Sequence, residues 1–323
     1  MHFSLKRLAM ASATAALLCA LTQAQAQTWP TKTVRFIVPF TPGGANDLMA
    51  RAAAEGAGKA LGQTVIVENR GGAGGSLGAD IVAKSSPDGY TFLISAAGVI
   101  SNSMIKKSLP FKDEDLVPVV MIGVAPSVIV VPKSAPYNTL REFVDASKKG
   151  QGFNFATAGT GSTPHFVAEM LNVKYGAKLQ PVPYKSGSES TTAVLSGQVE
   201  GTSEASIIAL PHIRGEARFK PLATTWTKRI SAYPQLTTAV EQGFPDLEIA
   251  HWAGLHAPRG TPPEIMDKLA AAVDKAMHDP VNSEKLRKLG IEPVGGTRPA
   301  FVTFVDAERK RLGEIVKAAN MKE

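Results

Sequence analysis

Two segments of this chain combine glycines with hydroxyl side chains immediately before a predicted helix. The first is the turn 40–44, which follows the buried run 34–38, and the second is the turn 158–165, which follows the run 153–157. Such turns leave backbone N–H groups unpaired at the positive end of a helix, which suits an anion. The alternative interpretation is an ordinary connection between a strand and a capped helix.

Proline and glycine indicate where the first strand ends and the first helix begins. Pro39 and Pro42 cannot donate to a β-ladder, so the strand should stop at residue 38. The glycines at 43 and 44 allow backbone angles that are closed to other residues. We expect Asn46 or Asp47 to cap a helix that runs through residues 52–54.

Strand and helix patterns alternate along the rest of the chain. The predicted strands are 62–69, 91–94, 153–157, 178–184, 198–204 and 219–225, and the predicted helices are 79–84, 139–149, 166–171, 188–195, 207–213, 264–277, 282–289 and 298–320. This order is typical of doubly wound, mostly parallel sheets. The long apolar runs 116–132 and 249–257 are predicted to cross between two lobes, comprising residues 27–123 with 249–323 and residues 124–248. Ligands then bind between the lobes, beyond the carboxyl ends of the strands.

The first 26 residues have the pattern of a secretory signal peptide. Lys6 and Arg7 precede the apolar run 8–21, and an Ala-x-Ala site ends at Ala26, so we expect cleavage before Gln27 and a periplasmic protein. A lipoprotein interpretation around Cys19 is weaker, because a bulky leucine precedes this cysteine. Cys19 is the only cysteine, so the mature chain has neither a disulfide nor a thiol nucleophile.

Composition and charge argue against a nucleic-acid-binding protein. The net charge of +7 falls to +5 without Lys6 and Arg7, and the remaining basic residues are scattered without interleaved aromatics. A mild attraction for anionic solutes is the safer inference.

Catalytic, metal and cofactor motifs do not emerge. The glycine-rich segment 71–78 contains a dinucleotide-type glycine spacing, but its glycines are too dense to be diagnostic. Gly161 and Ser162 lack the spacing of a nucleophile elbow, and the histidines are dispersed. We expect His251 and His256 at the edge of the core. Asp47, Glu68, Glu189 and Glu204 provide carboxylates, but no spacing singles out a catalytic pair. We therefore expect no enzyme, metal or cofactor.

A series of short motifs along the mature chain resembles the Bug proteins, the extracytoplasmic receptors of tripartite tricarboxylate transporters. The motifs include Val67-Glu-Asn-Arg-x-Gly-Ala-Gly-Gly75 and Pro87-Asp-Gly-Tyr-Thr91, together with the segments 29–51, 156–165, 183–185, 197–199, 209–213 and 254–262. The resemblance implies a two-lobed, type II-like periplasmic binding fold that closes on a small carboxylate. It also implies membrane transporter subunits as partners, and we expect a monomer.

The resemblance also implies a set of ligand-binding residues. The carboxylate is expected at the first turn, on Phe40, Thr41, Gly43 and Gly44, with Asp47 supporting the turn. The matching turn of the other lobe supplies Thr160, Gly161, Ser162 and Thr163, with His165 nearby. Further candidates stand where the family varies with its ligand, namely Ser95, Ala96, Tyr184 and Glu204.

This chain departs from the family pattern at an acid whose location the sequence leaves open. Glu204 either faces the cleft, where it favours a ligand with a donor group or an amine, or is a solvated surface residue. The expected function is capture of a di- or tricarboxylate or an aromatic carboxylate for transport. A ligand-sensing partner of a membrane signalling protein and a secreted enzyme are the alternatives.

Overall fold

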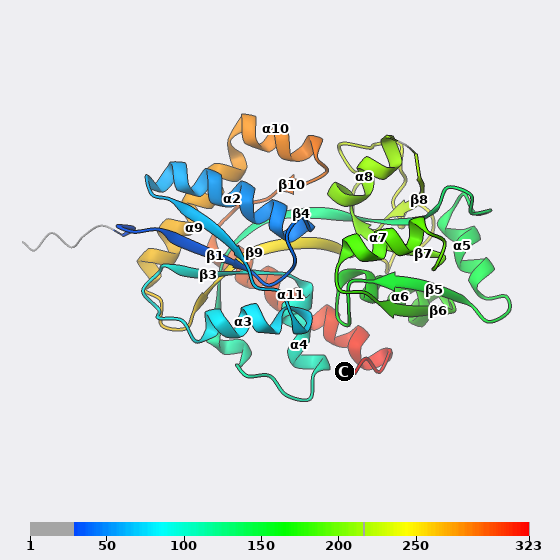
Figure 1. Cartoon of the computed structure of the whole chain (residues 1–323), viewed down its shortest axis with the longest axis horizontal. Helices are drawn as coiled ribbons and strands as arrows, with labels where there is room; N and C mark the ends of the chain where they lie inside the picture. The colour runs from blue at the N-terminus through cyan, green and yellow to red at the C-terminus, as the bar shows by residue number, and fades with distance from the viewer. Residues whose placement is uncertain (1–28, 216, 323) are drawn as a thin grey trace, which may run out of the picture.

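Two long strands connect the two halves of the molecule. The computed structural model describes residues 29–215 and 217–322, so the expected signal peptide lies outside the described residues. Strand β4 (Leu116–Pro132) runs from one half into the other, and β9 (Ala250–Pro258) lies antiparallel beside its first part (Figure 1). The apolar runs predicted to cross between lobes therefore form these two strands.

The first half places parallel strands beside β9. Its strands follow the order β2-β1-β3-β9, with β10 paired to β4, and helices surround them. The strands are β1 (Val34–Val38), β2 (Val65–Asn69), β3 (Thr91–Ser95) and β10 (Glu292–Pro293). The helices are α2 (Ala45–Leu61), α3 (Ser76–Ala83), α4 (Ala97–Ile105), α9 (Pro263–His278), α10 (Pro280–Lys288) and α11 (Arg298–Ala318). Two short 3₁₀ turns, η1 (Ala73–Gly75) and η2 (Asp113–Asp115), complete it.

The second half repeats the arrangement on the other part of β4. The strand order continues β4-β7-β5-β6, and β8 also pairs with β4. The bounds are β5 (Phe153–Thr157), β6 (Leu179–Pro183), β7 (Gly201–Ala205), β8 (Phe219–Thr224), α5 (Leu140–Ser147), α6 (Thr163–Tyr175), α7 (Gly187–Leu195) and α8 (Ser206–Arg214). The pairs of β5 with β6 and β7 are parallel, whereas β4 is antiparallel to β7 and β8.

Strand β4 changes partners near its middle. It pairs with β9 as far as Pro126, and from Ser127 onward it pairs with β7 and β8. The predicted residue limits of the lobes, 27–123 with 249–323 and 124–248, place the boundary close to this change and stay a prediction.

Each half has its own buried apolar cluster. In the first half, Phe36, Met49 and Phe92 pack with helices α2 and α9. In the second half, Phe143, Phe155 and Phe166 form the corresponding cluster. The first cluster also includes residues of β7 and α8, and the second includes residues of α4 and α11, so apolar packing joins the halves together with β4 and β9.

Some local predictions are wrong. The N-cap of α2 is Gly44 and not Asn46 or Asp47, because the helix already begins at Ala45. The side chain of Asn46 bonds Trp252, and that of Asp47 bonds the N–H of Gly43. Helix α6 begins at Thr163, three residues earlier than predicted, and helix α4 has no counterpart among the predicted elements. No helix within the described ranges is long and apolar enough to cross a membrane.

Candidate functional site

Five helices begin where strands end at the same region of the molecule. The strand–helix pairs are β1 with α2, β3 with α4, β5 with α6, β6 with α7, and β7 with α8. Each of these helices presents residues of its first turn or its cap to one cavity, namely Gly44, Ala45 and Asn46 of α2, Ala96 and Gly98 of α4, Ser162 and Thr163 of α6, Gly187 and Ser188 of α7, and Ala205 and Ile208 of α8. Because helix N-termini carry partial positive charge, their convergence favours an anion.

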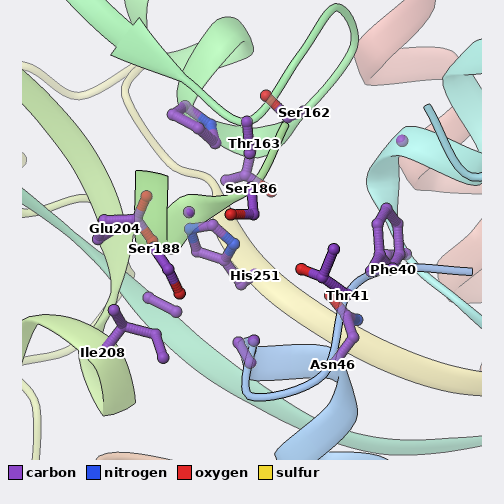
Figure 2. A pocket seen from close by; sticks show the side chains of 18 of the residues that line it. Phe40, Thr41, Asn46, Ser162, Thr163, Ser186, Ser188, Glu204, Ile208 and His251 are labelled. Atoms are coloured by element: carbon purple, nitrogen blue, oxygen red, sulfur yellow. The ribbon is translucent and has the colours of Figure 1, made fainter. Parts of the chain in front are cut away.

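The cavity lies between the two halves and is partly open to solvent. Its empty volume is about 770 Å³, including space open to solvent. Figure 2 shows Phe40, Thr41 and Asn46 on one side of the cavity and Glu204 and Ile208 on the other. The remaining lining residues are Ala158, Pro164, Lys185, Ser186 and His251.

Hydrogen bonds to the carboxylate of Asp47 fix the conformation of the first turn. Its carboxylate accepts hydrogen bonds from the N–H of Gly43 at 3.0 Å, from Arg51 at 3.0 Å and from Asn69 at 2.9 Å. Burial raises the pKa of Asp47, but the bonds from Arg51, Gly43 and Asn69 outweigh burial, so the pKa lies below its usual value. Asp47 is therefore an ionised brace for the turn and does not line the cavity.

The first turn of α2 offers free backbone donors. Among the described residues, no oxygen accepts a hydrogen bond from the N–H of Ala45 or Asn46. The side chain of Asn46 donates to the carbonyl of Trp252 on β9 at 3.0 Å, which fixes the helix end against the crossover strand. The backbone N–H groups at this helix end, together with the hydroxyl of Thr41, can donate hydrogen bonds to a carboxylate.

The turn before α6 has an internal brace of its own. The hydroxyl of Ser162 donates to the carbonyl of Gly159 at 2.6 Å, and the N–H of Gly161 donates to Nδ1 of His165 at 3.1 Å. The Nε2 atom of His165 lies 3.6 Å from Glu169. His165 therefore shapes the turn, while Ser162 and Thr163 reach the cavity.

Helix α4 joins this turn to the first half. The hydroxyl of Ser101 lies 3.2 Å from the carbonyl of Gly98 and 3.3 Å from the carbonyl of Gly161. A Cβ atom at Gly161 would lie 2.7 Å from the Ser101 hydroxyl, and its φ of +77° also favours glycine. The two halves thus contact each other directly at one margin of the cavity.

Glu204 is buried in the cavity wall. Its exposed fraction is 3%, so the alternative of a solvated surface acid is wrong. Burial raises the pKa of Glu204 to about 8, against the opposing effect of the backbone N–H of Ala205. Glu189, by contrast, is exposed, and it accepts a hydrogen bond from the N–H of Lys185 at 3.0 Å.

Two histidines on β9 have different surroundings. His251 lines the cavity, and burial lowers its pKa to about 4. His256 is buried beside Ser95, with 2.7 Å between Nδ1 and the hydroxyl oxygen, and burial lowers its pKa to about 3. The sequence prediction of a core position fits the environment of His256, whereas His251 belongs to the cavity.

The structure divides the sequence-predicted site residues into two groups. Those that line the cavity are Phe40, Thr41, Gly44, Ala96, Ser162, Thr163 and Glu204. Those behind it or beside it are Gly43, Asp47, Ser95, Thr160, Gly161, His165 and Tyr184. The residues that sequence reasoning missed include Asn46, Ser186, Ser188, Ile208 and His251. The serines follow a recognisable strand–turn–helix signal, but no local signal marks His251 as facing a cavity.

A two-lobed α/β fold with a cavity between its halves defines a periplasmic binding protein, and the comparisons agree. A family model described as the tripartite tricarboxylate transporter family receptor matches residues 49–321, so the chain belongs to this family. Protein BugT of Bordetella pertussis is 34% identical over 301 residues, covering 92% of each chain.

Two solved structures of similar proteins hold ligands. Rpa4515 of R. palustris with adipate has a TM-score of 0.85 and 31% identity, covering 91% of this chain and 99% of its own. MatC from Rhodopseudomonas palustris with bound malate has a TM-score of 0.82 and 30% identity, covering 89% of this chain and 100% of its own. The two structures agree with the predicted fold class, and the family match together with BugT confirms the Bug-type resemblance.

Proposed function

We propose that this protein is a periplasmic receptor that captures a small organic acid between its two lobes. The observation that supports the proposal most strongly is the convergence of five helix N-termini on one cavity. Backbone N–H groups and hydroxyls can donate hydrogen bonds to a carboxylate. They hold water less strongly than a lysine ammonium group does, so less free energy is needed to remove water from them on binding. The adipate and malate named with two relatives are consistent with this ligand class.

The carboxylate is proposed to bind at the N-terminus of α2. Thr41, Gly44, Ala45 and Asn46 line the cavity there, and Asp47 and Gly43 hold the turn from behind. Ser162 and Thr163 of the opposite lobe contact the ligand when the lobes approach each other. The Ser101–Gly161 contact at the margin is then part of the ligand-bound arrangement.

Delivery to a membrane transporter is the second part of the proposal, with cleavage of the leader after Ala26. The family match supports transport over enzymatic turnover, since its description is that of a transporter receptor. A role as ligand-sensing partner of a signalling protein needs the same closed lobes. A pull-down from membranes with and without ligand distinguishes the two roles by the membrane protein recovered.

The carboxylate proposal is tested by thermal unfolding of the ligand-stripped mature protein against a panel of acids. A ligand at 100 times its dissociation constant adds about 2.7 kcal/mol to the free energy of unfolding. At roughly 2–4 °C per kcal/mol, the midpoint rises by at least about 5 °C. Absence of a shift with dicarboxylates, citrate, aromatic acids and amino acids alike would refute the proposal.

A further inference from the structure

Two polar atoms in the cavity wall are buried without a hydrogen-bond partner. They are Oε1 of Glu204 and Nε2 of His251, and neither has a partner among the described residues. Glu204 comes from β7 and His251 from β9, and both side chains line the cavity (Figure 2). Buried polar atoms in native proteins are nearly always hydrogen-bonded, so we expect a ligand or water to form hydrogen bonds with these two atoms.

The imidazole of His251 offers an acceptor to the cavity. Its hydrogen bond with the backbone of Ser203 raises its pKa, as an accepting carbonyl does, although burial dominates and leaves the ring neutral at pH 7. A single ring proton on the nitrogen facing Ser203 satisfies that contact. The unpartnered Nε2 atom then holds a lone pair and needs a donor from the ligand.

The carboxyl group of Glu204 is fixed in place by its surroundings. A Cβ atom at Gly187 would lie 2.7 Å from Oε2 of Glu204, so the start of helix α7 lies directly against the carboxyl group. The backbone of Ala205 supplies a hydrogen bond to the same group. Oε1 is left for the cavity, and any side chain other than glycine at residue 187 would displace the carboxyl group from this position.

The cavity thus has two chemically different parts. The α2 end presents donors that suit a carboxylate. The opposite wall presents the unpartnered Nε2 atom of His251, which needs a donor, and the carboxyl group of Glu204, which becomes a full acceptor when it loses its proton to pair with a cation. Resting on the proposed function of a carboxylate receptor, we propose that the ligand is a monocarboxylate that also carries a protonated amine, held by Glu204 and His251. The second carboxylate of a dicarboxylate can bind there only while Glu204 stays protonated, and it has no donor for the Nε2 atom of His251.

Binding of an amine changes the protonation of Glu204. In the empty cavity burial keeps the carboxyl group protonated at neutral pH, with a pKa of about 8. An ammonium group beside it favours the carboxylate, so Glu204 loses its proton to the buffer as the ion pair forms. The other titratable residues that line the cavity within the described ranges are His251 and Lys185. A dicarboxylate favours the protonated form of Glu204 and releases no proton.

The test is isothermal titration of the mature protein with ligands matched in length. The panel contains amino acids and dicarboxylates of three to six carbons, for example 5-aminopentanoate against glutarate and pentanoate, together with α-amino acids. A buried charge-assisted bond predicts that the best amino acid binds at least about tenfold more tightly than the dicarboxylate of equal length. Titration in two buffers of different ionisation enthalpy should show release of about one proton per bound amine at pH 7.

Glu204→Gln and Glu264→Gln provide the matched pair of variants. Both remove one carboxylate, but Glu264 is exposed on α9 and does not line the cavity. Glu204→Gln should bring the ratio of amine to dicarboxylate affinity to within about threefold and abolish proton release, whereas Glu264→Gln should change neither.

The outcomes separate this inference from the function on which it rests. Binding of dicarboxylates as tightly as amino acids, with a ratio unchanged in Glu204→Gln, would overturn the amine assignment and leave the carboxylate receptor intact. It would also show that water, and not the ligand, forms the hydrogen bonds that Glu204 and His251 lack. No binding by any member of this panel, nor by citrate or aromatic acids, would overturn the receptor proposal itself.

Discussion

The burial of Glu204 and of the two β9 histidines makes the free energy of unfolding depend on pH. Burial raises the pKa of Glu204 to about 8, and lowers the pKa of His251 to about 4 and of His256 to about 3. The folded state therefore binds more protons than the unfolded chain at Glu204 between pH 4.5 and 8. It binds fewer protons at the histidines below pH 6.5.

This linkage predicts how stability depends on pH. The Glu204 contribution is complete below pH 4.5 and is lost as the pH rises towards 8, whereas the histidine contributions are lost as the pH falls below 6.5. Between pH 6.5 and 8 the histidine contributions no longer change with pH, so Glu204 alone among these three residues makes the stability depend on pH. The free energy of unfolding of the ligand-free protein should then fall by roughly 1 kcal/mol per pH unit.

Urea denaturation of wild type and Glu204→Gln at pH 6.5, 7, 7.5 and 8 measures this dependence. The variant should lose the downward slope and exceed the wild type in stability at pH 8, because glutamine carries no charge to desolvate. Glu264→Gln serves as the control and should keep the wild-type slope. Parallel profiles for wild type and Glu204→Gln would contradict the burial of an ionisable Glu204.

At the scale of elements, the contact between α4 and the turn before α6 joins the two halves. The hydroxyl of Ser101 bridges to the carbonyl of Gly161, whereas the hydroxyl of Ser103 on the same helix bonds Asp113 within the first half at 2.7 Å. The Ser101 bond crosses between the halves, so under the proposed function it favours the arrangement that encloses a ligand.

Ser101→Ala is expected to weaken ligand binding while leaving each half folded. Loss of one hydrogen bond of about 0.5–1.5 kcal/mol predicts a decrease in affinity of roughly 2–12-fold. Titration calorimetry compares the variant with Ser103→Ala, which removes a hydroxyl from the same helix without affecting the contact between halves. An equal loss in both variants would show that α4 acts through its own stability and not through this contact.

Prediction from sequence succeeded where the signal is local. The runs 34–38 and 153–157 with their glycine turns, and the cap of α5 by Thr139, are determined by neighbouring residues. Helix α4 was missed because Ala97, Gly98 and its three polar residues give no amphipathic pattern, although most of the segment is buried and its Ser101 contacts Gly161. Its helical structure depends on tertiary contacts.

The location of His251 could not be predicted for a different reason. It depends on the register of β9 on β4, in which His251 pairs with Ala125, while Glu204 pairs with Val128 from the other side of β4. A shift of one residue in either strand would turn these side chains to the opposite face. Such long-range registers are not specified by any short segment of sequence.

At the scale of the whole molecule, two lobes share the strands β4 and β9, and five helices begin at the cavity between them. The carboxylate site proposed there requires that the backbone at the start of α2 is open to the ligand. Gly44 lines the cavity, and a Cβ atom there would meet only the carbonyl oxygen of Thr41, at 3.6 Å. Its φ of −77° and ψ of 168° are also accessible to other residues.

The most direct measurement is calorimetric titration of wild type and Gly44→Val with the acid that gives the largest thermal shift. The valine side chain occupies the space in front of the α2 donors, so the variant should bind at least about 100-fold more weakly, as expected for loss of two charge-assisted bonds. Its unfolding temperature without ligand should match that of the wild type. Unchanged affinity in a folded Gly44→Val protein would show that the carboxylate does not bind at this turn.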